Sequence, residues 1–446
     1  MTGCLPRSRR QPREESITRP AISAHLKNAE GPLLYRSHHA TAILDRHSRL
    51  STIALLSYDD AFYVPSEGTG TAKNGTMDPR RPRQAVHNFP LRVLLIVPVL
   101  LAVLTAYTLY VHSDTNIYML WSQCHARARI PFLSRLPLIG TPACFLVSFF
   151  QEALAAAKSF GIMAAVLSFV AGLLTVTTVE AARICNSPSI LIAYPTGAWL
   201  IFNMMGGAIA WQLLILPAFF HRSRAIVAAR SQGPAELTGP GDPNFGEAMR
   251  HLTKVAETVA IPVAVALGCV LPSILMLVLD EPVSILLWLF FPVWVSLIRQ
   301  VVRKAVLFLQ EEWHGSFHLE SSRLAMAGMY LVPIICSVLS HGLLFWSMAQ
   351  ADDRKEMTRA TIKCIVIDVF FIALTVLYWL FVEAGWRPAL LMIGCSVLLG
   401  PGAGICIGWI YREQNVDPDR SVTVVAIGGR ASSREGSPSE ETPLLR

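Results

Sequence analysis

The sequence predicts an all-α fold, a polytopic integral membrane helix bundle of about eight transmembrane helices. Hydrophobic residues make up 53% of the 446 residues and charged residues only 15%, whereas a typical soluble domain has about 25% charged residues. The charged residues gather near the two ends of the chain and in the connections between long apolar runs. Apolar runs of this length, separated by short polar connections, are typical of a membrane protein.

The apolar runs give the positions of the expected helices. A helix needs about 20 apolar residues to cross a hydrocarbon core about 30 Å thick. This rule predicts eight spans, near residues 91–111, 161–179, 197–218, 259–279, 283–303, 325–347, 363–383 and 389–410. Residues 144–157 are apolar but too short to cross and contain Glu152, so they predict an interfacial or re-entrant helix.

The segments outside the bundle are polar. Residues 1–88 and 414–446 contain no long apolar run and predict disordered tails, which leaves 89–413 as the helical domain. We expect both tails in the cytosol and the protein in a membrane, crossing it several times, in the endoplasmic reticulum. Basic residues occur in loops on both sides of an eight-span bundle, so the positive-inside rule does not decide the orientation.

Charge and cysteine content exclude several functions. The net charge of +7 is explained by Lys and Arg residues that flank the spans, so nucleic acid is not an expected partner. The nine cysteines are far apart and mostly within apolar runs, which predicts free buried thiols rather than a disulfide framework or a zinc site. We predict no metal and no cofactor. A single DDxxE pattern, residues 352–356, predicts a solvated loop.

Two acids on one expected span are candidate catalytic groups. Asp368 lies within the apolar run and Glu383 at its end, and helical spacing puts them on one stripe with Thr375 and Trp379. An acid within a span is costly unless it is paired or faces a polar cavity. Asp368 is therefore our first choice of proton donor, although pairing with Lys363 near the headgroups remains an alternative. Glu383 has the same two interpretations.

Glu180 and Arg183 close the second expected span three residues apart, so their side chains can pair on one helix face. This pair is either a simple terminal ion pair or an acid or base that an arginine holds in position. We assign Glu180 and Arg183 as candidate catalytic residues on the second interpretation.

Aromatic residues within the spans are candidate lining residues for a cationic intermediate. Aromatic faces attract cations by about 0.5–2 kcal/mol each. The candidates are Trp199, Trp211, Tyr378 and Trp379, together with His341, a lone histidine within the sixth span. Aromatic belts at the membrane interfaces, and ordinary packing for His341, are the alternatives.

Several segments resemble the fungal membrane-bound terpene cyclases of meroterpenoid pathways, such as those of ascofuranone and macrophorin. The resemblance rests on VLSFVAGLLTVTTVEAARICN through IAYPTGAWLIFNMMGGAIAWQLLILPAFFHRSR, and on TVLYWLFVEAGW and LLGPGAGICIGWIYRE. It implies cyclisation of a farnesyl-type chain on a lipophilic prenylated aromatic or quinone substrate, started by a protonated acid and without a diphosphate. A pathway prenyltransferase and an epoxidase are the functional neighbours that it implies.

Two other classes remain open. A polytopic transporter or receptor of unknown cargo explains the span count equally well. A membrane prenyltransferase is the third possibility, but it would need a second aspartate-rich motif.

Overall fold

The computed structural model describes residues 90–112, 118, 120, 122, 140–231 and 251–416. Within these ranges the chain is helical apart from short connections, and two isolated β-bridges join Leu252 to Arg183 and to Phe317. The all-α prediction is therefore confirmed. The predicted tails lie outside the described residues, except that the last helix continues to Val416.

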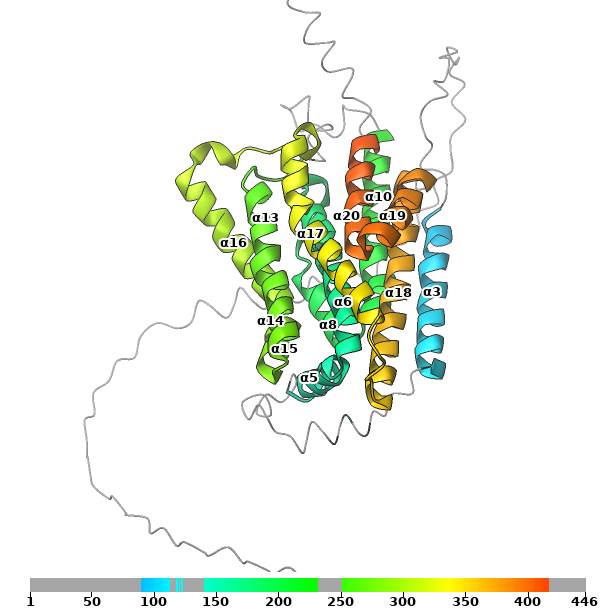
Figure 1. Ribbon diagram of the computed structural model, residues 1–446. Coiled ribbons are helices and arrows are strands. Elements are labelled where there is room, and N and C mark those ends of the chain that lie inside the picture. The colour runs from blue at the N-terminus through cyan, green and yellow to red at the C-terminus, as the bar shows by residue number, and fades with distance from the viewer. Residues whose placement is uncertain are drawn as a thin grey trace, which may run out of the picture. The chain divides into compact units, whose positions relative to one another are not determined.

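Five of the eight expected spans are single helices, long and apolar enough to cross a membrane. A sixth expected span consists of two helices with a bend of 62° between them, which counts as a crossing if the pair is one span. The five are α3 (Leu91–His112), α6 (Ala157–Ala182), α13–η4–α14 (Glu257–Leu279), α17 (Arg323–Met348) and α18 (Glu356–Ala384). The bent pair is α15 (Pro282–Leu289) and α16 (Phe291–Leu309) (Figure 1).

The third expected span, 197–218, is a helical hairpin. Helix α8 (Thr196–Met205) ends at Gly206, and α9 (Gly207–Ala210) then leads through the π-helical turn η3 (Trp211–Ile215) into α10 (Leu216–Ser231). The rings of Trp199 and Trp211 are 5.8 Å apart, whereas in one straight helix they would be separated by about 18 Å. Arg222 Nε donates to the Cys185 carbonyl at 2.5 Å, so the chain leaves at the end of the bundle where it entered.

The eighth expected span, 389–410, has the same architecture. Helix α19 (Trp386–Leu399) ends at Gly400 and α20 (Pro401–Val416) returns. Arg412 on α20 pairs with Glu383 at the end of α18, although a straight helix would separate these residues by about 43 Å. We call the two structures hairpin A (196–231) and hairpin B (386–416).

Glycine makes both hairpin tips possible. Gly206 has φ 104° and Gly400 has φ 94°, a region that costs other L-residues about 1–2 kcal/mol. The prediction of eight spans is not confirmed, because hydropathy does not register a turn within an apolar run. The described residues instead form five spans, or six if the bent pair is one span, and two hairpins that enter from the same end.

The short segment 144–157 does not cross. Helix α5 (Gly140–Leu154) lies across one end of the bundle (Figure 1), as expected of an interfacial helix. Its Glu152 Oε1 accepts a hydrogen bond of 2.8 Å from Thr358 Oγ1 on α18. Cys144 in α5 is disulfide-bonded, which contradicts the expectation of free thiols at this position. The six other described cysteines are free.

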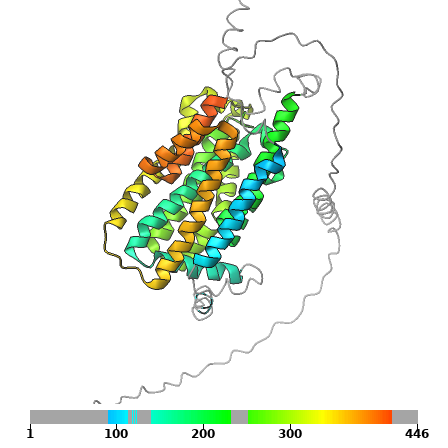
Figure 2. The same ribbon diagram turned by 90° about the vertical axis from the view of Figure 1, so that its right-hand side faces the viewer.

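Helix α6 forms the centre of the bundle, and 89% of the residues in its apolar 18-residue stretch are buried. It packs closely on α20, where a Cβ atom at Gly172 would lie 2.8 Å from the Gly402 carbonyl oxygen. On the outer side, α3 packs against α18 and α10 (Figure 2). The two hairpins and α18 therefore meet the end of α6, and this meeting point is the candidate site.

Candidate functional site

Four buried tryptophans from different elements form a continuous wall. Trp199 of α8 packs on Trp211 at 5.8 Å, Trp211 on Trp379 of α18 at 6.3 Å, and Trp379 on Trp409 of α20 at 4.4 Å between ring centroids. All four have less than 2% of their surface exposed. The structure thus brings together the predicted lining residues Trp199, Trp211 and Trp379, and adds Trp409. We call these four residues the tryptophan wall.

Two other predicted lining residues lie elsewhere. The Tyr378 hydroxyl donates to the Leu94 carbonyl at 2.9 Å, which ties α18 to α3. His341 Nε2 lies 3.0 Å from the Val397 carbonyl oxygen, and its ring packs on Phe345. Both residues connect helices outside the tryptophan wall, and their role as lining residues stays a prediction.

Beside the wall is a buried group of charged residues that we call the carboxylate cluster: Glu180, Glu320, Glu383 and Glu413, with Arg183 and Arg412. Arg183 holds three of the carboxylates. Its Nη2 is 2.6 Å from Glu413 Oε2, its Nη1 2.9 Å from Glu320 Oε1, and its Nε 3.4 Å from Glu180 Oε1. The expected Glu180–Arg183 pair therefore forms, within a larger network.

Arg412 connects the same cluster to the tryptophan wall. Its Nη1 lies 3.1 Å from Glu180 Oε1 and 2.5 Å from Glu413 Oε1, and its Nη2 contacts Glu383. Its guanidinium lies 4.6 Å from the centre of the Trp409 ring. Trp409 Nε1 also donates to Glu180 Oε1 at 3.2 Å, so Glu180 contacts both the arginines and the wall.

The cluster contains more acids than bases. Four carboxylates face two guanidinium groups, so full ionisation would leave two negative charges without compensation in a buried site. Such charges are costly and favour retention of protons. Glu320 lies before the span α17. Burial raises the pKa of its carboxyl group, the charge of Arg183 lowers this pKa, and the neighbouring carboxyl group of Glu413 raises it further. The arrangement therefore favours a protonated carboxyl beside ionised ones.

The sequence indicated only part of this cluster. Ile372, Thr375, Trp379 and Glu383 are buried, as the predicted stripe requires. Glu320, Arg412 and Glu413 were missed, because they look like ordinary charges flanking a span. They are buried because hairpin B returns to the end of the bundle from which it started, and no local sequence pattern signals that return.

Asp368 lies apart from the cluster, about 22 Å from Glu383 along α18. Its carboxylate oxygens accept hydrogen bonds from the backbone N–H groups of Gly207 at 3.1 Å and Ala208 at 3.0 Å. These N–H groups begin the return limb of hairpin A, where backbone groups within a membrane need a partner. The geometry gives Asp368 the role of a helix cap. Its predicted role as proton donor remains untested.

The DDxxE loop is also structural. Asp352 pairs with Arg354 at 2.8 Å, and this hydrogen bond holds the pKa of Asp352 below its usual range. Asp353 accepts the N–H groups of Ala157 at 2.8 Å and Lys158 at 3.3 Å, at the start of α6. In the part of the chain that the structure describes, no three His, Cys, Asp or Glu side chains are grouped as metal ligands.

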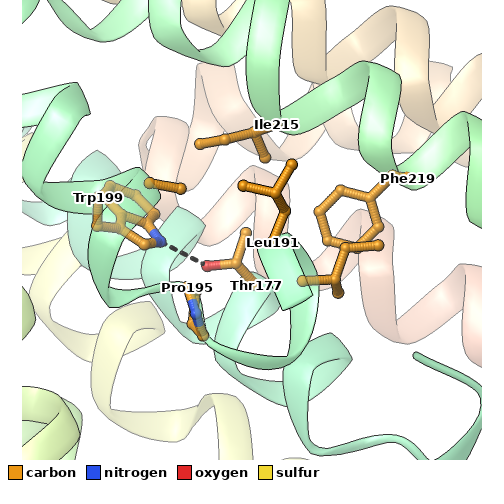
Figure 3. A pocket seen from close by; sticks show the side chains of 8 residues that line it. Thr177, Leu191, Pro195, Trp199, Ile215 and Phe219 are labelled. Atoms are coloured by element: carbon orange, nitrogen blue, oxygen red, sulfur yellow. Dashed lines mark hydrogen bonds between the residues drawn. The ribbon is translucent and has the colours of Figure 1, made fainter. Parts of the chain in front are cut away.

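A small pocket lies on the other side of the tryptophan wall (Figure 3). It has about 220 Å³ of empty space, part of it open to the outside. Trp199 Nε1 donates to Thr177 Oγ1 at 3.1 Å within it, and Phe219 in its lining packs on Trp379 at 4.4 Å. Thr177 is one helical turn before Glu180 on the same face of α6, so the lining of the pocket comes within one turn of the carboxylate cluster.

The fold and the site define a polytopic membrane protein with a buried acidic centre behind a tryptophan wall. The family model described as CtvD domain matches residues 138–353, just under half of the chain. That family is associated with meroterpenoid and terpene cyclase-like proteins. No curated protein and no solved structure matches the chain.

The matched segment contains one half of the site. Glu180, Arg183 and Glu320 lie within it, as do Trp199 and Trp211. The other half comes from α18 and hairpin B, beyond residue 353: Glu383, Arg412, Glu413, Trp379 and Trp409.

Proposed function

We propose that the protein is a membrane-bound terpene cyclase that protonates and cyclises the farnesyl-type chain of a meroterpenoid intermediate. The substrate is a lipophilic prenylated aromatic or quinone, with a terminal alkene or epoxide, and the proposed location is the endoplasmic reticulum. The observation that carries the proposal is the excess of buried carboxyl groups directly beside the tryptophan wall. The match to the CtvD domain supports the same class of activity.

The proposed reaction starts and ends at carboxyl groups. A protonated carboxyl donates its proton to the epoxide oxygen or the terminal alkene, and the C–O bond or the π bond breaks to leave a carbocation. Internal alkenes attack this cation and close rings, and a carboxylate removes the final proton. The product is an isomer of the substrate, so no cofactor is needed. Desolvation keeps an acid protonated near neutral pH, and an apolar site excludes water from the cation.

We assign Glu180 as the acid or base nearest the substrate. It shares a face of α6 with Thr177 in the pocket, and it contacts Trp409 in the wall. Arg183 and Arg412 hold its Oε1 and are positioning residues. Trp199 and Trp379 would stabilise the cation by about 0.5–2 kcal/mol each.

The pocket must enlarge to accept this substrate. Its comparable cavity volume is about 10 Å³, room for about one water molecule, which is far below the roughly 300–1,000 Å³ of ordinary ligand sites. Leu191 and Phe219 line it, and rotation of such side chains would open it further.

The test compares Glu180→Gln with Glu257→Gln in microsomes from a yeast host, supplied with a farnesylated phenol and its terminal epoxide. Glu257 is the matched control, because it is also buried and bound to two arginines, Arg299 at 2.7 Å and Arg303 at 3.0 Å, outside the cluster. A general acid typically increases the rate of the catalysed step by about 10²–10⁴-fold. We expect Glu180→Gln to lose at least about 100-fold of the cyclic product per folded protein, and the control to lose less than about threefold.

A loss of less than about tenfold in Glu180→Gln, equivalent to about 1.4 kcal/mol of barrier, excludes Glu180 as the acid. If wild-type protein forms no cyclic product from either substrate, the proposed reaction on these substrates is wrong.

The two hairpins favour a transporter as a second candidate, because broken helices near the middle of the membrane form substrate sites in many transporters. Against this, Asp368 already occupies the N–H groups at the break in hairpin A. Uptake of a labelled prenylated quinone into proteoliposomes without chemical change would support transport.

A further inference from the structure

We propose that His318 and Glu320 form a proton relay between the aqueous end of the bundle and the carboxylate cluster. This proposal rests on the proposed function for its role in turnover. The relay itself can be measured without substrate.

The geometry of the relay is a chain from the surface inward. Glu320 lies in the short helix η6 (Leu319–Ser321), directly before α17, and its side chain is only 5% exposed. One carboxylate oxygen, Oε1, is 2.9 Å from Arg183 in the cluster, and the other, Oε2, is 3.3 Å from His318 Nε2. The His318 side chain is 30% exposed. The two oxygens of one carboxyl group thus face the buried cluster and a partly exposed imidazole.

The backbone fixes this imidazole in place. Phe317 and Leu252 exchange two backbone hydrogen bonds, of 2.8 Å and 3.1 Å, in an isolated β-bridge. The neighbouring residues His318 and His251 then stack, with ring centroids 4.8 Å apart. A third bond of 2.9 Å, from Ile184 N–H to the His251 carbonyl, ties this pair to the end of α6. The connection between spans is therefore held against the cluster.

The groups around Glu320 allow a proton to pass inward. Arg183 faces it from the end of α6 and Glu413 from α20, and Tyr330 of α17 faces Arg183 and Glu413. Glu320 and Glu413 are both bound to Arg183, at 2.9 Å and 2.6 Å. Burial raises the pKa of Glu320, so its carboxyl group is suited to take up and release a proton. The guanidinium of Arg183 does not release one.

A cyclase of the proposed kind needs such a route. Each turnover transfers one proton from an acid to the substrate and one proton from the substrate to a base. When the acid and the base are different carboxyl groups, the acid must be protonated again and the base must lose its proton. Water reaches His318, the imidazole exchanges a proton with Glu320 Oε2, and Glu413, bound to the same Arg183, continues the route into the cluster.

The experiment measures hydrogen–deuterium exchange of protonated carboxyl groups by infrared spectroscopy of the full chain in proteoliposomes, without substrate. After a switch to D₂O we expect the wild-type carboxyl band to shift rapidly. His318→Gln should slow this shift at least tenfold, and added imidazole should restore part of the rate. Glu320→Gln should slow the shift of the remaining band and should not respond to imidazole. His341→Gln is the control, because this histidine contacts only hairpin B and α17 in the bonds given above.

Exchange at the wild-type rate in a folded His318→Gln protein overturns the relay, as does a slowed rate that imidazole does not change. If His318→Gln fails to fold, the decision rests on Glu320→Gln, where an unchanged exchange rate of the remaining carboxyl groups has the same meaning. Loss of the relay with intact cyclisation of substrate, or the reverse, separates this proposal from the proposed function.

Discussion

At the scale of single residues, the carboxylate cluster depends on two arginines. Removal of one partner from a buried ionic network costs about 3–5 kcal/mol, because charges are left buried without compensation. Arg412→Gln leaves Glu180, Glu383 and Glu413 with less compensation. We expect a loss of about 3–5 kcal/mol in the free energy of unfolding, measured as a lower melting midpoint of the protein in detergent.

The control for Arg412 is Arg359→Gln. Arg359 pairs with Asp352 at 3.2 Å, but its side chain is 55% exposed. Surface ion pairs contribute little because water screens them, so the melting midpoint should not change measurably. Equal effects of the two substitutions would mean that the buried network does not support the fold.

Asp368 offers a second test at the residue scale. In Asp368→Asn, an amide N–H₂ group faces one of the N–H groups of Gly207 and Ala208, so one buried donor loses its acceptor. A buried unsatisfied donor costs about 1–3 kcal/mol. We expect less folded protein in the membrane but an unchanged ratio of cyclic to linear product per folded molecule.

The opposite result would restore the assignment made from the sequence. If Asp368→Asn accumulates like wild type and loses more than tenfold of its cyclisation rate, Asp368 is the proton donor and Glu180 is secondary.

At the scale of helices, the glycine at the tip of hairpin A can be tested with a matched pair. A Cβ atom added at either Gly206 or Gly197 meets nothing within 4 Å, but only Gly206 has a positive φ, of 104°. Gly206→Ala should therefore destabilise by about 1–2 kcal/mol through backbone strain. Gly197→Ala, within α8, should stabilise by about 0.5–1 kcal/mol. Thermal unfolding of both proteins in detergent measures the difference.

A straight helix through residue 206 would reverse this expectation. Gly206→Ala would then stabilise the protein as much as Gly197→Ala does, and hairpin A would be wrong.

The helices also show what sequence patterns can predict. All eight apolar runs are helical, because length and apolar composition determine where helices form in a membrane. Gly206 and Gly400 are visible in the sequence, but a glycine within a span is more often a packing residue than a turn. Contacts with residues far away in the sequence, such as those of Asp368 at the tip of hairpin A, determine whether such a glycine forms a turn. The burial of Glu413 and Glu320 depends on the same kind of long-range packing. It could therefore not be predicted from the local sequence either.

At the scale of the whole molecule, the hairpins change which connections share a face of the membrane. Residues 187–189 precede hairpin A and residues 251–256 follow it. If residues 197–218 crossed the membrane, these two segments would lie on opposite faces. With hairpin A they share a face, since the Ile184 N–H donates to the His251 carbonyl at 2.9 Å. We expect glycosylation acceptors inserted into the two segments to give the same result, with both modified or neither.

Modification of only one of the two acceptors would mean that residues 197–218 cross the membrane. An acceptor inserted into the connection 310–322 provides the internal reference, because Phe317 of this connection binds Leu252 at the end of the bundle where the cluster lies.

The disulfide at Cys144 indicates how the molecule is oriented in the membrane. Disulfides persist in oxidising compartments and are rare in the cytosol, and Cys144 lies in α5, at the opposite end of α6 from Glu180, about 35 Å away. We therefore expect the acidic centre and both open ends of the hairpins to face the cytosolic leaflet. Lipophilic intermediates would be exchanged within that leaflet, next to enzymes whose active sites open to the cytosol, and the protons would come from a solution held near neutral pH.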